Sequence, residues 1–245
     1  MLGHFGPQPF VTTEQRGCPI NMRRNNRDGF TLTELLVVMA VIGIVAGLLV
    51  PSIILGKRKA QQIQCISNLH QLGLALHACL EDDHAYPTYP LWMDKLQHEG
   101  MGISTPTGRY PEHKGVWKCP QTQLYMCYGY NAFGVLHGEH SAEYYNTNAL
   151  GLLAHGQPAR ESEVVNPSDM LAIGDSFDNS LTLMRCPSKE LPGFTDRLTR
   201  HQGKANVVLC DGHVESPTVQ FLFDDTGDTA LVKWNRDHAP HRDRL

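Results

Sequence analysis

Two histidines and two carboxylates in the C-terminal part of the chain have side chains that bind metal ions. They are Asp175, His201, Asp211 and His213. Two imidazoles with two carboxylates suit a zinc-like or other transition ion, whereas calcium prefers carboxylates and carbonyls. The alternative needs no ion: Asp211 accepts backbone amides in its own turn, and His201 pairs with a nearby carboxylate or carbonyl. Both interpretations stay open, and the first predicts a bound divalent metal.

The segment around Asp211 has a clear local pattern. Residues 206–210 are typical of a strand, Asp211-Gly212 is a preferred pair for a type I′ turn, and residues 213–215 begin the return strand. A β-hairpin is therefore predicted, and nothing catalytic is needed to explain it.

Motifs of the common enzyme classes do not occur in the sequence. There is no Gly-x-Ser-x-Gly, no His-Glu-x-x-His, no glycine loop for phosphate and no cysteine set spaced as a zinc finger. Asp175-Ser176 with His201 would be a weak nucleophile and base, because such pairs arise by chance in a chain of this size. We do not expect an enzyme.

Six of the seven cysteines lie beyond residue 29. Cys65 and Cys79 lie on one predicted helix about 21 Å apart, beyond the reach of a disulfide. Cys119 and Cys127 flank a short loop that contains proline, and a bridge between them is predicted in an oxidising compartment. Buried free thiols are the alternative.

Near the N-terminus, Glu34 is the only charged residue between Phe30 and Val50. These 21 residues would form a helix about 31 Å long, which matches the hydrocarbon core of a bilayer. A carboxylate in hydrocarbon costs roughly 2.5 kcal/mol or more, so Glu34 should have a partner or a function. A plain signal anchor that tolerates one glutamate is the alternative.

Four arginines precede this span and outnumber two acids: Arg16, Arg23, Arg24 and Arg27 against Glu14 and Asp28. Basic residues beside an apolar span stay in the cytoplasm. The N-terminus is therefore predicted inside and the remainder outside. A compact basic leader would begin at Met22, so Met1 and Met22 are both candidate starts.

The order Gly29-Phe30-Thr31-Leu32-x-Glu34 before an apolar helix resembles the N-terminus of type IV prepilins and type II secretion pseudopilins. In that family a membrane peptidase cuts after the glycine and methylates the new N-terminal phenylalanine. The resemblance implies cleavage between Gly29 and Phe30 and N-methylation of Phe30. It also implies that Glu34 meets the N-terminus of a neighbouring subunit in a fibre.

The spacing of His201 to Asp211-Gly212, with nine residues between, resembles the H-X9-DG element of a large group of prepilin-like proteins in planctomycetes and verrucomicrobia. Residues 117–120, 128–131 and 173–176 also resemble pieces of that group's domain. With both ends matched, the resemblance covers most of the chain.

An amphipathic stem helix is predicted after a kink at Pro51. Its apolar face is Ile63, Ile66, Leu69, Gly73, Leu76 and Leu80. The fold class is α+β, with this long N-terminal helix packed on a small antiparallel sheet, as in pilins. The predicted segments are a cleaved, partly disordered leader (1–29), a transmembrane helix (30–50), the stem (51–82) and a β-rich extracytoplasmic domain (83–245).

Within that domain, one short helix is expected at 91–98 and strands at 115–120, 125–131 and 170–174, while 161–165 is expected to pair or turn. Removing the leader leaves 216 residues with a formal charge of about −6 and no basic cluster, so nucleic acid is not an expected partner.

The resemblance implies a structural subunit of the inner membrane, a pseudopilin or minor pilin. It would be processed by prepilin peptidase and would assemble with other pilin-like subunits into a type II secretion or type IV pilus-like fibre. The alternative is a membrane-tethered periplasmic module that binds a metal or a polysaccharide and uses a pilin-type anchor without polymerising.

Overall fold

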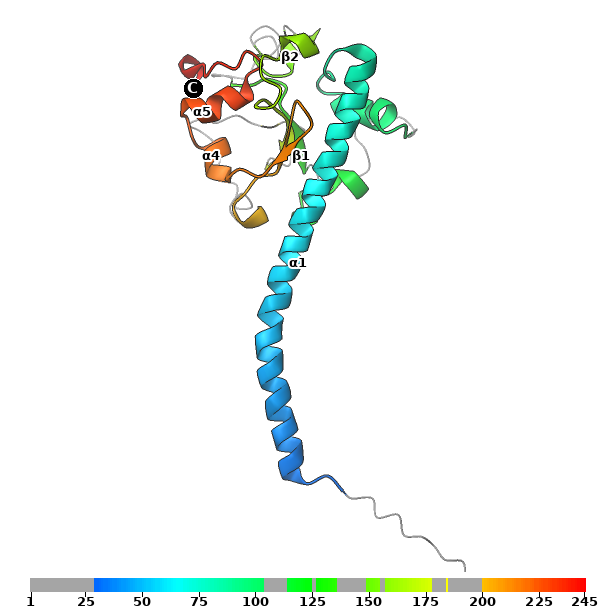
Figure 1. Cartoon of the computed structure of the whole chain (residues 1–245), viewed down its shortest axis with the longest axis vertical. Coiled ribbons are helices and arrows are strands. Elements are labelled where there is room, and N and C mark those ends of the chain that lie inside the picture. The colour runs from blue at the N-terminus through cyan, green and yellow to red at the C-terminus, as the bar shows by residue number, and fades with distance from the viewer. Residues whose placement is uncertain are drawn as a thin grey trace, which may run out of the picture. The chain divides into compact units, whose positions relative to one another are not determined.

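The structure is a computed structural model that describes residues 29–103, 114–124, 127–135, 149–154, 157–177, 184 and 200–245. The predicted leader lies outside these residues except for Gly29. The chain divides into two compact units, one ending at Leu49 and one formed by Val50–Leu245, and each is described by itself (Figure 1).

One helix, α1 (Leu32–Asp83), carries both the predicted membrane span and the predicted stem. It begins at a capping box, in which the Glu34 amide donates to Thr31 Oγ1 and the Thr31 amide donates to Glu34 Oε2, over 3.3 and 2.9 Å. The helix continues through Pro51 and ends before Pro87, as the acids and the proline there predicted. A kink at Pro51 stays a prediction.

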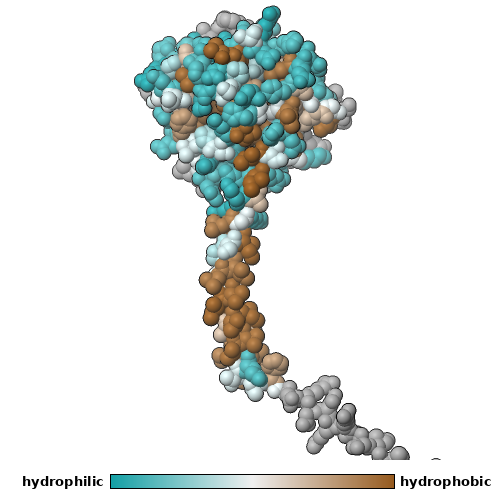
Figure 2. Space-filling model, in the orientation of Figure 1, coloured by the Kyte–Doolittle hydropathy of each residue, from teal (hydrophilic) through white to brown (hydrophobic). Residues whose placement is uncertain are grey.

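The N-terminal part of α1 is apolar on all sides and long enough to cross a membrane. Its large side chains are exposed, with Leu48 at 72% and Ile44 at 65%. They form a continuous hydrophobic surface in the first unit (Figure 2). In water, exposing such a surface is unfavourable. In a bilayer, it is the lipid-facing surface expected of a membrane-spanning helix.

The second unit contains a four-stranded antiparallel sheet with the order β1-β4-β5-β6. The strands are β1 (Tyr128–Tyr130), β4 (Leu171–Asp175), β5 (Val207–Leu209) and β6 (Val214–Glu215). A separate pair consists of β2 (Leu153–Ala154) and β3 (Gln157–Pro158). The predicted α+β class with a long N-terminal helix and a small antiparallel sheet is confirmed.

Alternating side chains of β5 place the sheet between two hydrophobic clusters. Val208 belongs to the cluster formed with the stem part of α1. Its neighbours Val207 and Leu209 belong to a second cluster with α4 (Val219–Phe223) and α5 (Asp228–Leu231). Because successive side chains of a strand point to opposite faces, both faces of the sheet are covered.

The buried face of the stem differs in part from the predicted one. Four of its six predicted members are buried: Leu69, Gly73, Leu76 and Leu80. Ile63 is 56% exposed and Ile66 is half-buried. Gln62 and Cys65 are buried in their place, and the neighbouring Gln61 Nε2 donates to the Pro120 carbonyl over 3.2 Å.

Several connecting segments are short helices. They are α2 (Trp92–Lys95), the π-helix η1 (Leu96–Gly100), and the 3-10 helices η2 (Gly115–Trp117), η3 (Glu161–Glu163), η4 (Arg200–Gln202), η5 (Val232–Trp234) and η6 (Arg242–Arg244). The helix expected at 91–98 is confirmed. The segment 161–165 was expected to pair or turn, and it begins with the short 3-10 turn η3. The strand expected at 115–120 is wrong, because Gly115 at φ +60 starts a tight turn that an extended strand excludes.

Candidate functional site

The centre of the domain holds a fully buried ion pair at the end of β4. Arg200 donates through NH2 to Asp175 Oδ1 over 2.7 Å, and both side chains are completely excluded from solvent. Asp175 Oδ2 accepts from the Asn206 amide, also over 2.7 Å. Burial raises the pKa of Asp175, but the charge of Arg200 and the surrounding hydrogen bonds outweigh it, so the pKa lies below its ordinary value. The carboxylate is therefore held ionised inside the core.

Arg200 also fixes the loops that meet at this point. Its NH1 donates to the Ser176 carbonyl over 2.7 Å, and its NH2 donates to the Cys127 carbonyl over 2.9 Å. The guanidinium carbon lies 5.2 Å from the ring centre of Phe177. One side chain thus satisfies a backbone acceptor next to each strand, at the same end of the β1–β4 pair.

His201 lies beside this pair in a left-handed backbone conformation, with φ 51. Its Nε2 is 3.2 Å from Asp175 Oδ2 and 3.5 Å from Cys119 Sγ. Burial lowers the pKa of His201, but hydrogen bonds to Asp175 and Cys119 outweigh it and raise the pKa to about 9. The buried Nδ1 has no hydrogen-bond partner among the residues that the structure describes.

Two thiols complete the cluster. Cys65 Sγ from α1, Cys119 Sγ and a ring nitrogen of His201 all lie within 4.8 Å of one another, and all three residues are buried. A hydrogen bond with Cys65 and, less strongly, one with His201 lower the pKa of Cys119 to about 5 against the effect of burial. The same contact raises the pKa of Cys65. The arrangement places two thiols and an imidazole nitrogen in mutual contact inside the core.

The structure brings together only two of the four predicted metal ligands. Asp175 and His201 meet in the buried cluster. Asp211 and His213 instead pair with each other on the exposed hairpin, where His213 Nδ1 is 2.6 Å from Asp211 Oδ1. The predicted four-residue site is therefore wrong, because β5 carries Asp211 along the strand and away from Asn206, the point where Asp175 is bound.

The hairpin is confirmed, but its turn is not type I′. The Gly212 amide donates to the Leu209 carbonyl and the Leu209 amide donates to the His213 carbonyl, both over 2.9 Å. Gly212 has φ +89, whereas Asp211 is not in the left-handed region that a type I′ turn needs at both central residues. The connection is a three-residue loop with glycine in the left-handed position.

This loop packs against the stem helix. A Cβ on Gly212 would lie 2.9 Å from the His77 ring, and a Cβ on Gly73 would lie 3.2 Å from the Gly212 carbonyl oxygen. The two ends of the H-X9-DG element therefore lie in different environments. His201 enters the buried cluster, and the Asp-Gly turn lies against α1.

The bridge predicted between Cys119 and Cys127 is not formed in the structure. All five described cysteines, which are Cys65, Cys79, Cys119, Cys127 and Cys210, are buried free thiols. Cys119 faces Cys65 and His201, while the Cys127 thiol donates to the Leu124 carbonyl over 3.4 Å. The two sulfurs thus have different partners.

Sequence reasoning missed Arg200 and Cys65 as members of this site. A signal for Arg200 was present: Asp175 ends an apolar run, and a buried carboxylate needs a cation or several donors. Cys65 carried no comparable signal, because its spacing on α1 marks it only as part of a buried face.

At the N-terminus, Gly29 and Phe30 are exposed, and Phe30 is 82% accessible. Glu34 Oε2 accepts from both the amide and the hydroxyl of Thr31, over 2.9 and 2.8 Å. Both bonds end on one carboxylate oxygen. The carboxylate therefore has a partner within its own chain, and its predicted contact with a neighbouring N-terminus stays a prediction.

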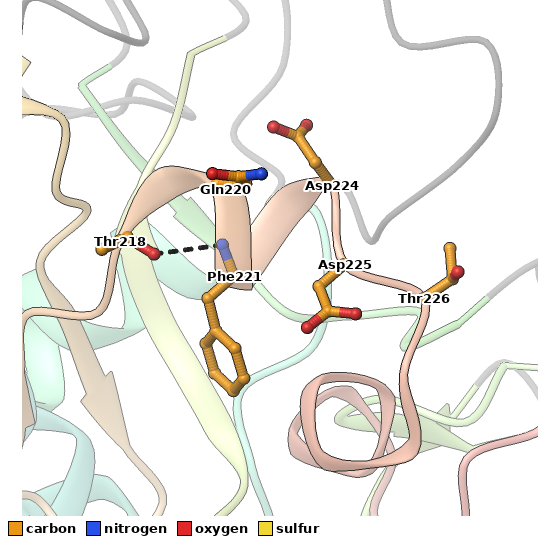
Figure 3. A pocket seen from close by; sticks show the side chains of 6 residues that line it. All are labelled: Thr218, Gln220, Phe221, Asp224, Asp225 and Thr226. Carbon is orange, nitrogen blue, oxygen red and sulfur yellow. Dashed lines mark hydrogen bonds between the residues drawn. The ribbon is translucent and has the colours of Figure 1, made fainter.

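A surface pocket of about 490 Å³ lies beside α4 (Figure 3). Asp224 and Asp225 point apart in it rather than toward a shared point. Thr218 Oγ1 caps α4 by accepting from the Phe221 amide, and Asp225 accepts from the Gly227 amide over 2.8 Å. Thr218 and Asp225 thus bind nearby backbone amides, and we do not take the pocket as a candidate site.

Comparisons with known proteins match part of the chain. Residues 24–50 match a family model described as the prokaryotic N-terminal methylation motif. The chain is 40% identical over 100 residues to the type II secretion system core protein G of Klebsiella michiganensis, covering 41% of this chain and 70% of that protein. It is 34% identical over 85 residues to the corresponding protein of Aeromonas hydrophila.

A third relative, the core protein G of Escherichia coli, is 42% identical over 68 residues. The Aeromonas match covers 35% of this chain and 59% of that protein. The Escherichia match covers 28% of this chain and 47% of that protein. The chain thus spans roughly half to two thirds of the length of most of these relatives. No solved structure gives a significant match.

Proposed function

The chain belongs to the pseudopilin family of the type II secretion system core protein G, and on that premise we propose that it is cleaved after Gly29, methylated on Phe30 and assembled into a short fibre. It is a pseudopilin-like subunit with an N-terminal membrane anchor. The proposed partners are prepilin peptidase and other pilin-like subunits. The relatives are structural subunits and not enzymes, and no catalytic step is assigned to this chain.

The observation that carries the proposal is the exposed apolar first half of α1 with a single acid at its start. Apolar side chains cover every side of this segment, so it fits lipid before assembly and neighbouring helices after it. Both contacts of Glu34 with Thr31 use Oε2, which leaves Oε1 to accept from a cationic N-terminus of a neighbouring subunit.

The proposed orientation puts the leader in the cytoplasm and Val50–Leu245 in the periplasm. The four arginines upstream of Phe30 support this direction. After cleavage, Phe30 would carry a free amine four residues before Glu34. A fibre in which each amine meets a neighbouring carboxylate neutralises two charges that are expensive in hydrocarbon.

Three variants test whether the charge of Glu34 or only its cap is needed. Glu34→Ala removes both, and Glu34→Gln keeps an oxygen for Thr31 but removes the charge. Thr31→Val removes the two hydrogen bonds of the Thr31 hydroxyl but keeps the charge. The proportion of the subunit in a fibre fraction sheared from cells would be compared with the proportion in the membrane.

We expect Glu34→Ala and Glu34→Gln to insert and to be cleaved but to leave the fibre fraction, while Thr31→Val assembles. Normal assembly of Glu34→Gln would show that Glu34 serves only as a helix cap, and the inter-subunit contact would then be rejected. The comparisons give no support to the alternative of a tethered binding module that does not polymerise.

A further inference from the structure

The buried trio of Cys65, Cys119 and His201 joins three parts of the chain that are distant in sequence. Cys65 lies on the stem of α1, Cys119 follows η2, and His201 precedes β5. All three are fully inaccessible to solvent, with a relative exposure of 0%. Within the part of the chain that the structure describes, no other set of three metal-ligating residues converges in this way.

The distances in this trio are compatible with a shared metal ion. Zinc bonds of about 2.3 Å to sulfur and about 2.0–2.1 Å to nitrogen give a tetrahedral edge of about 3.5 Å between the two ligand atoms. Cys119 Sγ and His201 Nε2 are 3.5 Å apart.

We propose that Cys65, Cys119 and His201 bind one Zn²⁺ ion, which ties the stem helix to the sheet domain. Asp175 lies outside the trio, and its two oxygens are bound to Arg200 and to the Asn206 amide, so a water molecule would take the fourth position. Two thiolates with one histidine form a ligand set that suits zinc and excludes calcium and magnesium.

The charges of the buried residues are compatible with this ion. Two thiolates balance Zn²⁺, His201 is neutral as a ligand, and Arg200 balances Asp175. The buried group as a whole therefore carries no net charge. This matters because an uncompensated charge at a fully buried site is strongly destabilising.

A disulfide between Cys65 and Cys119 is the competing outcome, because thiols this close oxidise in an oxidising compartment. The structure has both residues as free thiols and places an imidazole nitrogen beside them. A disulfide would form between the two sulfurs without the histidine, whereas a metal site would include the histidine as its third ligand. The geometry thus favours the metal, and the experiment decides between them.

The test uses the full chain, extracted from membranes with detergent and without chelator. Metal content is measured by plasma mass spectrometry, and the state of each cysteine is measured by alkylation and peptide mass spectrometry. After removal of the metal under reducing conditions, Co²⁺ is added as a probe, because thiolate ligation gives a characteristic charge-transfer absorption.

Three variants remove one ligand each: Cys65→Ser, Cys119→Ser and His201→Asn. Asparagine is chosen because it tolerates the left-handed backbone at φ 51. Cys79→Ser is the matched control, since Cys79 is a fully buried free thiol on the same helix and lies outside the trio.

We expect stoichiometric zinc and the Co²⁺ spectrum in the wild type and in Cys79→Ser, and loss of both in the three ligand variants. A metal-free wild type with Cys65 and Cys119 joined in a disulfide would overturn the proposal. So would a wild type with free thiols and no Co²⁺ spectrum. Neither result depends on fibre assembly, so the outcome is separate from that of the Glu34 variants.

Discussion

The guanidinium of Arg200 and the carboxylate of Asp175 meet over 2.7 Å in the centre of the domain, where neither side chain contacts solvent. Arg200 also holds the carbonyls of Ser176 and Cys127. The pair therefore joins the ends of β1 and β4 to the segment that leads into β5. Its burial makes it sensitive to the loss of either partner.

Replacing Arg200 by Met should lower the free energy of unfolding by about 3–5 kcal/mol, because it leaves Asp175 buried without its cation. Chemical denaturation of the full chain in detergent measures this. Arg242→Met is the control, since Arg242 and Asp228 pair on the surface at 61% and 58% exposure and should contribute less than about 1 kcal/mol. Equal losses in the two variants would contradict the role assigned to Arg200.

Gly73→Ala should destabilise the domain by about 1–3 kcal/mol, because the new methyl group would lie 2.9 Å from Val208 and 3.2 Å from the Gly212 carbonyl oxygen. Gly56→Ala, on the same helix with nothing within 4 Å, should instead stabilise it by up to about 1 kcal/mol. Thermal unfolding of both variants measures the difference. Docking of the Asp-Gly turn on α1 would be disproved if Gly73→Ala also raised the stability.

The Asp211–His213 pair should respond to pH. Burial lowers the pKa of His213, but Asp211 and then Glu215 outweigh it, so the pKa is raised in the folded protein. A raised pKa means that the pair stabilises the fold below the ordinary pKa of His213, and that this contribution is lost as the pH rises through the folded value. The side chain is 44% exposed, so solvent reduces the effect.

Nuclear magnetic resonance of histidine-labelled protein measures this pKa directly. Asp211→Asn should lower the pKa of His213 more than Glu215→Gln does. The reason is that Asp211 lies 2.6 Å from the ring, whereas Glu215 lies 3.4 Å away and also faces Lys233. A larger shift in Glu215→Gln would reverse the assignment.

Gly29→Val should block removal of the leader, because the proposed peptidase site has glycine before the cleaved bond. Intact-mass measurement of the membrane protein should then show the leader retained and Phe30 unmethylated. Gly43→Val is the control, since Gly43 lies inside α1 with open space around it. If the Gly29→Val variant were still cleaved before Phe30, glycine at position 29 would not be what the peptidase recognises.

The local elements were predictable where one short segment carries its own pattern. The apolar run after Phe30, the acids before Pro87, the strand that ends at Asp175 and the hairpin at Gly212 are each decided by neighbouring residues. The tight turn at Gly115 was not predicted. It depends on the positive φ of this glycine, and the sequence shows the glycine but not its backbone angle.

The sequence by itself determined the membrane helix, the acid within it and the α+β class, because periodicity and hydrophobicity act over a few turns of chain. Only the tertiary structure decided the chemistry of the core. Cys119 and His201 are 82 residues apart, and they meet because the segment after η2 and the helix η4 converge beside Cys65 of the stem helix. The packing of η4 beside the end of β4 likewise brings Arg200 and His201 to Asp175. Asp211 and His213 pair with each other on the exposed hairpin, because long-range contacts are set by packing rather than by sequence spacing.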